Sequence, residues 1–241
     1  MSPVREADQG KGSGETGRFP GYAPPMPPCG LDVAATTAGQ PFCAGVILMV
    51  DGRLVATLNR DHLPAELEGN ALRVGGVGGG QEPGETIWEC AVREALEEVS
   101  CDVKLLSSPR TYLRDADGAL RPARCRDAFA PLLFEWGTRE DAAPYAPGLP
   151  SGERLYNAFF LARPSGAPQP GDVEGLVLMP PSAWPLVERQ ATLRDVVEAG
   201  ASILERTRIL RETPLWTFPD DAMRTVCELV TREPELVAAL R

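Results

Sequence analysis

The feature that most constrains this chain is a glycine turn followed by a helix with an acidic stripe. Residues 79–101 read GGQEPGETIWECAVREALEEVSC. At about 100° per residue, Glu94, Glu97 and Glu98 share one narrow face of that helix. Like charges at this spacing repel each other and weaken an isolated helix. We therefore interpret the face as a site for a divalent cation, which prefers hard oxygen ligands.

The start of the helix is marked by a capping box, in which Thr86 and Glu89 form the Thr-x-x-Glu pattern. This places Glu85 in the turn, just outside the helix. The apolar residues that follow helical spacing lie away from the carboxylates. They are Trp88, Ala91, Val92, Ala95, Leu96 and Val99. The pattern predicts a helix that ends near Ser100, packs one side on a sheet and turns the other toward a cleft.

The same segment resembles the signature of the Nudix hydrolase family. That signature is Gly, five residues, Glu, seven residues, then Arg-Glu-U-x-Glu-Glu-x-Gly-U, where U is aliphatic. Six fixed positions are in register: Gly79, Glu85, Arg93, Glu94, Glu97 and Glu98. Two late positions depart from it, because Ser100 stands at the glycine and Cys101 at the aliphatic residue. The resemblance implies an α/β fold, an α/β/α sandwich with a mixed sheet, and a pyrophosphohydrolase.

The resemblance also implies a metal site. In the family the corresponding glutamates bind the metal, which suggests Mg²⁺, with Mn²⁺ as a substitute. The implied ligands are Glu94, Glu97, Glu98 and the carbonyl of Gly79, and Glu85 either supports the loop or reaches the metal through water. Such ions neutralise a diphosphate and lower the pKa of bound water. Arg93 is expected to pair with a motif glutamate and to orient the carboxylates.

The general base is open between the helix and a distant loop. Glu94 is the candidate within the helix, and we also count Glu97 and Arg93 among the catalytic residues. Loop 137–153 offers Glu140 and Glu153 at its two ends, and we select Glu153 of these two. Catalysis requires the base to reach the attacking water directly or through one more water.

Substrate binding is expected near the glycines and the loop. Five of residues 75–80 are glycine, which lets a ligand approach the main chain closely. We select Gly78 and Gly80 for this reason. Tyr145 and Tyr156 are candidates for stacking a nucleobase. The four tryptophans are interpreted as core residues, and the single histidine, His62, as an ordinary surface residue.

Composition excludes several other classes of protein. A formal net charge of −10 disfavours non-specific nucleic-acid binding, which needs Lys and Arg on the phosphates. No apolar run reaches about 18 residues, so we expect no membrane span. The polar N-terminus lacks a signal core, which predicts a cytoplasmic protein. The six cysteines form no CxxC pair, which favours reduced thiols over a zinc site.

The chain divides into three predicted parts: a flexible Pro/Gly-rich arm over 1–38, a Nudix domain over 39–190, and a helical extension over 191–241 packed on the core. Asp51-Gly52 predicts a hairpin between strands 42–50 and 53–59. Residues 60–80 are expected to form a long connection. Further strands are expected at 103–106, 110–114, 128–136, 155–162 and 173–179. Helices are expected from Ser182, over 193–210 and over 220–231.

The leading hypothesis is a hydrolase that cleaves the pyrophosphate bond of a nucleoside diphosphate linked to another moiety, such as a nucleotide sugar or an ADP-ribose-like compound. The partner would thus be a small-molecule nucleotide. The alternative is a catalytically weak Nudix-fold regulator that binds nucleotides. Homodimers are frequent in the family, so we expect a homodimer.

Overall fold

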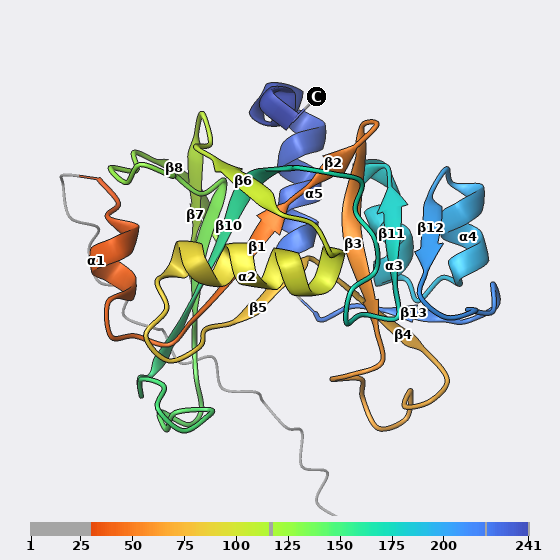
Figure 1. Ribbon diagram of the computed structural model, residues 1–241, viewed down its shortest axis with the longest axis horizontal. Coiled ribbons are helices and arrows are strands. Elements are labelled where there is room, and N and C mark those ends of the chain that lie inside the picture. Colours follow the sequence, from red (N-terminus) through yellow and green to blue (C-terminus); the bar gives the residue numbers. More distant parts are fainter. Residues whose placement is uncertain (1–29, 116–117, 220, 241) are drawn as a thin grey trace, which may run out of the picture.

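The computed structural model describes residues 30–115, 118–219 and 221–240. The strands of these residues form two mixed sheets. In Figure 1, helix α2 (Ile87–Val99) lies across the front of the strands, whereas α3 (Trp184–Glu188) and α5 (Ala222–Arg232) lie behind them. The mixed α/β sandwich expected from the sequence is confirmed.

The first sheet has the order β5-β1-β10-β9-β7-β8, with β6 paired to β10. Strand β1 is parallel to β10, and β7 is parallel to β9, while the other pairs are antiparallel. The strands are β1 (Phe42–Ile47), β5 (Val77–Gly80), β6 (Val103–Leu106), β7 (Thr111–Arg114), β8 (Leu120–Ala123), β9 (Leu133–Thr138) and β10 (Arg154–Pro164). The strand predicted at 103–106 is present with those bounds, and the strands predicted at 110–114, 128–136 and 155–162 are present with shifted ends.

The second sheet has the order β12-β11-β3-β4-β13, with β2 paired to β3. Its strands are β2 (Met49–Val50), β3 (Arg53–Asn59), β4 (Leu72–Gly75), β11 (Gly175–Met179), β12 (Ser202–Glu205) and β13 (Leu215–Trp216). Strand β13 runs parallel to β4, and the other neighbours are antiparallel. The Asp51-Gly52 turn joins β2 to β3 as predicted. The chain crosses from the first sheet to the second at Leu48, which is fully buried.

Two sequence predictions about these strands are wrong. Residues 60–80 are not one long connection, because they contain β4 and β5; glycine-rich strands lack the side-chain alternation that would reveal them. The helix predicted over 193–210 ends early, since α4 covers Leu193–Glu198 and Ser202–Glu205 pairs with β11. Pairing at a sheet edge overrides the weaker local helical pattern.

The helices cap the sheets at several points. Besides α2, α3, α4 and α5, the chain forms α1 (Val33–Thr37), η1 (Pro181–Ala183) and η2 (Pro234–Leu240). The helical start predicted at Ser182 is confirmed by η1 and α3, and the predicted last helix by α5. The described residues of the predicted helical extension, 191–219 and 221–240, therefore also contain strands β12 and β13.

The end of the predicted N-terminal arm packs on the core. Residues 1–29 of that arm lie outside the described residues, but Leu31 and Val33 are buried. The N–H of Val33 donates to Asp127 Oδ2 at 2.7 Å, and Asp32 caps α1 through the N–H of Ala35 at 2.8 Å. Flexibility is therefore the wrong prediction for residues 30–38, because α1 supplies apolar side chains that the first sheet covers.

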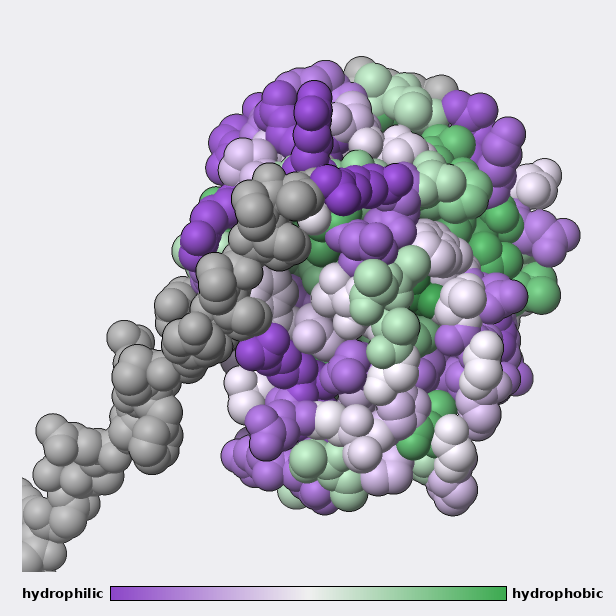
Figure 2. Space-filling model, turned by 90° about the vertical axis from the view of Figure 1, so that its left-hand side faces the viewer, coloured by the Kyte–Doolittle hydropathy of each residue, from purple (hydrophilic) through white to green (hydrophobic). Residues whose placement is uncertain are grey.

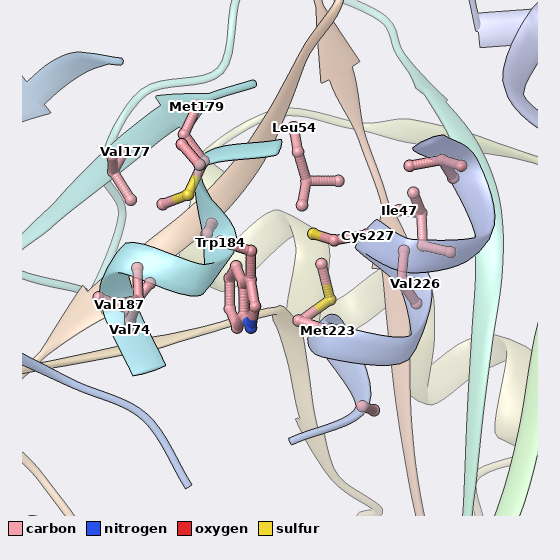
Figure 3. Close-up of a cluster of buried hydrophobic side chains, with 14 of the residues drawn as sticks. Ile47, Leu54, Val74, Val177, Met179, Trp184, Val187, Met223, Val226 and Cys227 are labelled. Atoms are coloured by element: carbon pink, nitrogen blue, oxygen red, sulfur yellow. The ribbon is translucent and has the colours of Figure 1, made fainter. Parts of the chain in front are cut away.

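Side-chain alternation in the strands builds one core on each side of the sheets. Phe42, Ala44 and Val46 of β1 pack with the apolar stripe of α2. Ile47, at the end of β1, packs with α3 and α5 instead. In Figure 3, Trp184 of α3 lies between Met179 and the sulfur-containing side chains of α5. Burial of large apolar side chains contributes roughly 1.5–3 kcal/mol each.

Helix α2 is fixed at both ends. Thr86 and Glu89 form the predicted capping box. At the other end, Ser100 adopts the left-handed conformation, with φ 49° and ψ 32°. This is the conformation that glycine adopts without strain, which explains why the family signature has glycine there. The segment 169–172 then donates its N–H groups to the last carbonyls of α2, including Gly171 to Glu98 at 2.9 Å and Asp172 to Glu97 at 3.0 Å.

The surface mixes polar and apolar residues. On the face shown in Figure 2, hydrophilic residues surround smaller groups of hydrophobic ones. Large hydrophobic side chains exposed among the described residues come from separate elements: Leu96, Phe129, Tyr145, Val197, Leu210 and Phe218. Within the described ranges, no helix is long and apolar enough to cross a membrane.

We predict that Gly171→Ala destabilises the protein, because a Cβ at this position would overlap the carbonyl oxygen of Glu97. Forced overlap in a packed region costs about 1–3 kcal/mol. Gly166→Ala is the matched control, since a Cβ at Gly166 meets nothing within 4 Å. Urea denaturation of both variants measures the difference, and equal midpoints would show that the loop moves aside without cost.

Candidate active site

A cleft of about 730 Å³ lies where the two sheets meet. One wall carries the acidic residues of α2, together with the glycines of β5. The other wall comes from the end of β3, the connection that follows it, β4 and Phe218. Residues 172–174, which lead into β11, complete the lining.

The Arg93 side chain holds three motif carboxylates together. Its Nε and Nη2 donate to the two oxygens of Glu85 at 2.6 and 3.0 Å. Its Nη1 donates to Glu94 and to Glu97, both at 2.8 Å. Nη2 also donates to the carbonyl of Gly80 at 2.8 Å. Arg93 thus joins the turn, the helix and β5.

The charge of Arg93 affects the acids around it. Partial burial favours the neutral form of Glu85, but hydrogen bonds from Arg93 and from the N–H of Glu82 prevail and lower its pKa. The pKa of Arg93 is itself raised, chiefly by its hydrogen bond with Glu85. The guanidinium and the Glu85 carboxylate therefore both stay ionised near neutral pH.

Glu94 faces the cleft and presses against Gly79. A Cβ on Gly79 would lie 2.5 Å from Glu94 Oε2, so a side chain at this position would push the Glu94 carboxylate aside. Burial raises the pKa of Glu94, and the charge of Arg93 only partly opposes that rise. The Glu94 carboxylate therefore lies against the main chain of β5 at Gly79.

Glu98 is the most buried of the motif acids, with 9% of its surface exposed. One of its oxygens accepts a hydrogen bond of 2.7 Å from the N–H of Gly78. Burial raises its pKa to about 8, and the charges of Glu94 and Asp172 add to the rise. Gly78 and the charge of Arg73 act in the opposite direction. Without a nearby cation, the surroundings of Glu98 therefore disfavour its ionised form.

The donors in this part of the cleft fit a hard divalent cation, because all of them are oxygens. Glu94, Glu98 and Asp172 each contribute a carboxylate to the lining, and Gly79 adds its main chain. Two of these acids have pKa values raised by burial, and a cation would favour their ionised forms. Among the described residues, however, no three acidic, His or Cys side chains already converge on one point. Binding would thus require the side chains to rotate.

The structure separates the predicted site residues into two groups. Gly78, Gly79, Gly80, Glu94 and Glu98 line the cleft. Glu85, Arg93 and Glu97 stand beside it and are connected to it through the Arg93 hydrogen bonds.

The loop residues predicted as catalytic or stacking groups are placed differently. Glu153 and Glu140 are exposed and do not line the cleft, so the choice of Glu153 as base is not supported by its position. Tyr156 is buried and stacks on Phe134 at 5.9 Å, so it is a core residue rather than a platform for a base. Tyr145 is half exposed beside Gly80, and its hydroxyl donates to the carbonyl of Gln81 at 3.1 Å.

The sequence analysis did not identify several residues that line the cleft. They are Arg60, His62, Arg73, Asp172 and Phe218. His62 was interpreted as surface, and its side chain is indeed 73% exposed, but it borders the cleft. Asp172 and Phe218 lie far from the motif along the chain, whereas Arg60 and Arg73 precede it, on the connection between β3 and β4 and on β4 respectively. The fold brings all four to the cleft that the acids line.

Comparison with known families agrees with this geometry. The NUDIX domain profile matches residues 41–200, well over half of the chain. The chain belongs to the Nudix hydrolase family. The predicted enzyme class, a Nudix-type pyrophosphohydrolase, follows from this membership. Nudix hydrolases use divalent metal ions and act on small-molecule nucleotides. Family membership therefore confirms a divalent metal ion as the class of cofactor and a small-molecule nucleotide as the class of partner.

Solved structures similar to this Nudix hydrolase share little sequence with it. An ADP-ribose pyrophosphatase from Streptococcus suis is 11% identical, with 80% of this chain and 92% of that one covered and a TM-score of 0.37. The Escherichia coli dihydroneopterin triphosphate pyrophosphohydrolase is 17% identical, with coverage of 59% and 82% and a TM-score of 0.36. The E. coli ORF135 protein is 15% identical, with coverage of 59% and 74% and a TM-score of 0.34. No curated protein matches the chain.

We predict that Glu98 makes the metal-free Nudix hydrolase less stable as pH rises. Its folded pKa of about 8 lies above the ordinary 4.5. The stability that its protonated form contributes is therefore complete below about pH 4.5 and is lost as pH rises toward 8. Melting temperatures in EDTA between pH 5 and 8.5 should fall more steeply for the native protein than for Glu98→Gln. Glu198→Gln, an exposed change on α4, should keep the native slope, and parallel slopes for all three proteins would contradict the prediction.

Proposed function

We propose that this enzyme hydrolyses the pyrophosphate bond of a nucleoside diphosphate linked to another moiety. The observation that supports it best is one cleft lined both by the carboxylates of Glu94 and Glu98 and by the guanidinium groups of Arg60 and Arg73. A diphosphate needs both, because cations on the acids can neutralise one side of it while arginines bind the remaining oxygens. We propose Mg²⁺ as the metal, with Mn²⁺ as a substitute.

We assign the metal to Glu98, Glu94 and the carbonyl of Gly79, with Glu97 and Glu85 as supporting acids. When bound, the ion supplies charge neutralisation and activates water for attack. Glu97 and Glu85 both bond to Arg93, so their contribution is to fix that guanidinium. Arg93 in turn orients the Glu94 carboxylate toward the cleft.

Asp172 replaces Glu153 as our loop candidate for the general base. It lines the cleft, and its main chain is held by the carbonyl of Glu97 at 3.0 Å. Its charge contributes to the raised pKa values of Glu94 and Glu98, so the carboxylate is near both. A water between these acids could pass a proton to Asp172 and keep Glu94 free to bind the metal.

We predict that Glu98→Gln leaves the protein folded and lowers turnover by roughly 10²–10³-fold, the usual effect of removing one preorganised electrostatic group. The assay measures nucleoside monophosphate released from nucleotide sugars, ADP-ribose, dinucleoside polyphosphates and nucleoside triphosphates with Mg²⁺. Asp172→Asn should lower turnover with a smaller effect on metal binding. Glu198→Gln serves as the control and should match the native rate.

A second measurement separates metal binding from turnover. Calorimetric titration with Mn²⁺ should show weaker binding to Glu98→Gln than to the native protein. Native turnover and native Mn²⁺ affinity in that variant would remove Glu98 from the ligand set. If none of the nucleotides is hydrolysed, the enzyme proposal fails.

A nucleotide-binding regulator is the second candidate function. One observation favours it: Arg93 and Gly78 already occupy oxygens of Glu94 and Glu98, so the acids are not preassembled around a metal. Tight nucleotide binding without turnover of any compound would support this alternative. The expected homodimer stays a prediction, which sedimentation analysis can decide.

A further inference from the structure

Phe218 is an unusual member of the cleft lining. Its side chain is aromatic and the residue is 42% exposed, yet its neighbours in the lining are mostly charged or glycine. It lies beyond residues 41–200, the part that matches the NUDIX domain. The ring is therefore an addition that the C-terminal part of this particular chain makes to the cleft.

The fold fixes the position of Phe218. It follows β13, which pairs in parallel with β4 so that Trp216 stands opposite Arg73. The Trp216 ring meets the Phe218 ring edge-on, with centroids 4.9 Å apart and an angle of 67°. The Arg73 guanidinium lies 5.7 Å from the centre of the Phe218 ring. Phe218 is thus flanked by two planar groups rather than standing alone on the surface.

Arg73 is itself held in place. Its Nη2 donates to Asp61 Oδ1 at 3.0 Å, and its Nε donates to the Asp61 carbonyl at 3.3 Å. Only 15% of the Arg73 side chain is exposed. A guanidinium fixed in this way loses little entropy when a ligand binds. The pair thus presents an aromatic ring, with a cationic group over it, to the cleft that the acids also line.

This arrangement suits one part of the proposed substrate. Single exposed apolar residues are normal on protein surfaces, and Phe129, at 41%, is an example outside the cleft. Phe218 differs because it shares a cleft with the acids and lies against a cation. Stacking a nucleobase on such a platform is worth about 1–3 kcal/mol and does not depend on which base it is.

We propose that Phe218, supported by Arg73, is the platform on which the nucleobase of the substrate stacks. The proposal rests on the proposed function, because that function supplies a nucleotide with its diphosphate at Glu94 and Glu98. Arg73 then lies between the base and the diphosphate and can bond to a phosphate oxygen. The substrate class is a nucleotide recognised by the planarity of its base rather than by base-edge hydrogen bonds.

The test compares ligands with and without a base. Calorimetry with Mg²⁺ measures binding of AMP, CMP and ribose 5-phosphate to the native protein, Phe218→Ala, Phe218→Tyr and Phe129→Ala. The native protein should bind both nucleotides more tightly than ribose 5-phosphate. In Phe218→Ala the two nucleotides should bind roughly tenfold more weakly or worse, and their advantage over ribose 5-phosphate should disappear. Phe218→Tyr keeps the ring and should retain the advantage, and Phe129→Ala should behave as native.

Kinetics separate this proposal from the proposed function. For a hydrolysed nucleotide, Phe218→Ala should raise KM far more than it lowers kcat. Turnover with native KM in Phe218→Ala would overturn the stacking platform and leave the hydrolase intact. If no nucleotide is hydrolysed but the native protein binds nucleotides more tightly than Phe218→Ala does, the proposed hydrolase activity is overturned and the stacking platform is supported. An equal preference for AMP over ribose 5-phosphate in native protein and Phe218→Ala also overturns the platform.

Discussion

The site depends first on the hydrogen bonds of one guanidinium. Arg93 binds Glu85 from the turn, Glu94 and Glu97 from the helix, and the carbonyl of Gly80 from β5. Without a cation at this position, three carboxylates on neighbouring turns would repel each other and the turn would separate from the helix. Arg93 needs its planar fork for this, because a lysine cannot bond in several directions within one plane.

Close packing of the main chain is the second requirement. Glu94 lies against Gly79, and the loop that carries Asp172 lies against the last turn of α2 through Gly171. A Cβ at Gly171 would overlap the carbonyl oxygen of Glu97, and a Cβ at Gly79 would displace the Glu94 carboxylate. The two contacts bring acids from α2 and from the segment before β11 to one cleft, although these residues are far apart in the sequence. Burial, with a smaller contribution from the neighbouring acids, raises the pKa values of Glu94 and Glu98 in this cleft.

Sequence reasoning succeeded where the determining contacts are local. The capping box, the hairpin at Asp51-Gly52 and the pairing of Arg93 with motif acids all lie within a few residues or turns of one another. It failed where the determining neighbours are distant in the sequence. The segment of β12 was predicted to be helical, but it pairs with β11. Tyr156 was predicted to stack a nucleobase, but it stacks on Phe134 in the core. Glu153 and Asp172 are both acidic loop residues, and Asp172 is the one that lines the cleft. The residues next to each of them in the sequence do not distinguish the two.

The sequence by itself determined the helix, its acidic face, the turn that approaches it and the family to which they belong, because spacing along one helix fixes which side chains share a face. Only the tertiary structure decided which other residues line the cleft. Phe218 reaches the cleft because β13 pairs with β4, the strand that carries Arg73, and strand pairing joins residues at any separation along the chain. Glu94 and Glu98 are therefore placed by local spacing, whereas Asp172 and Phe218 are placed by the fold.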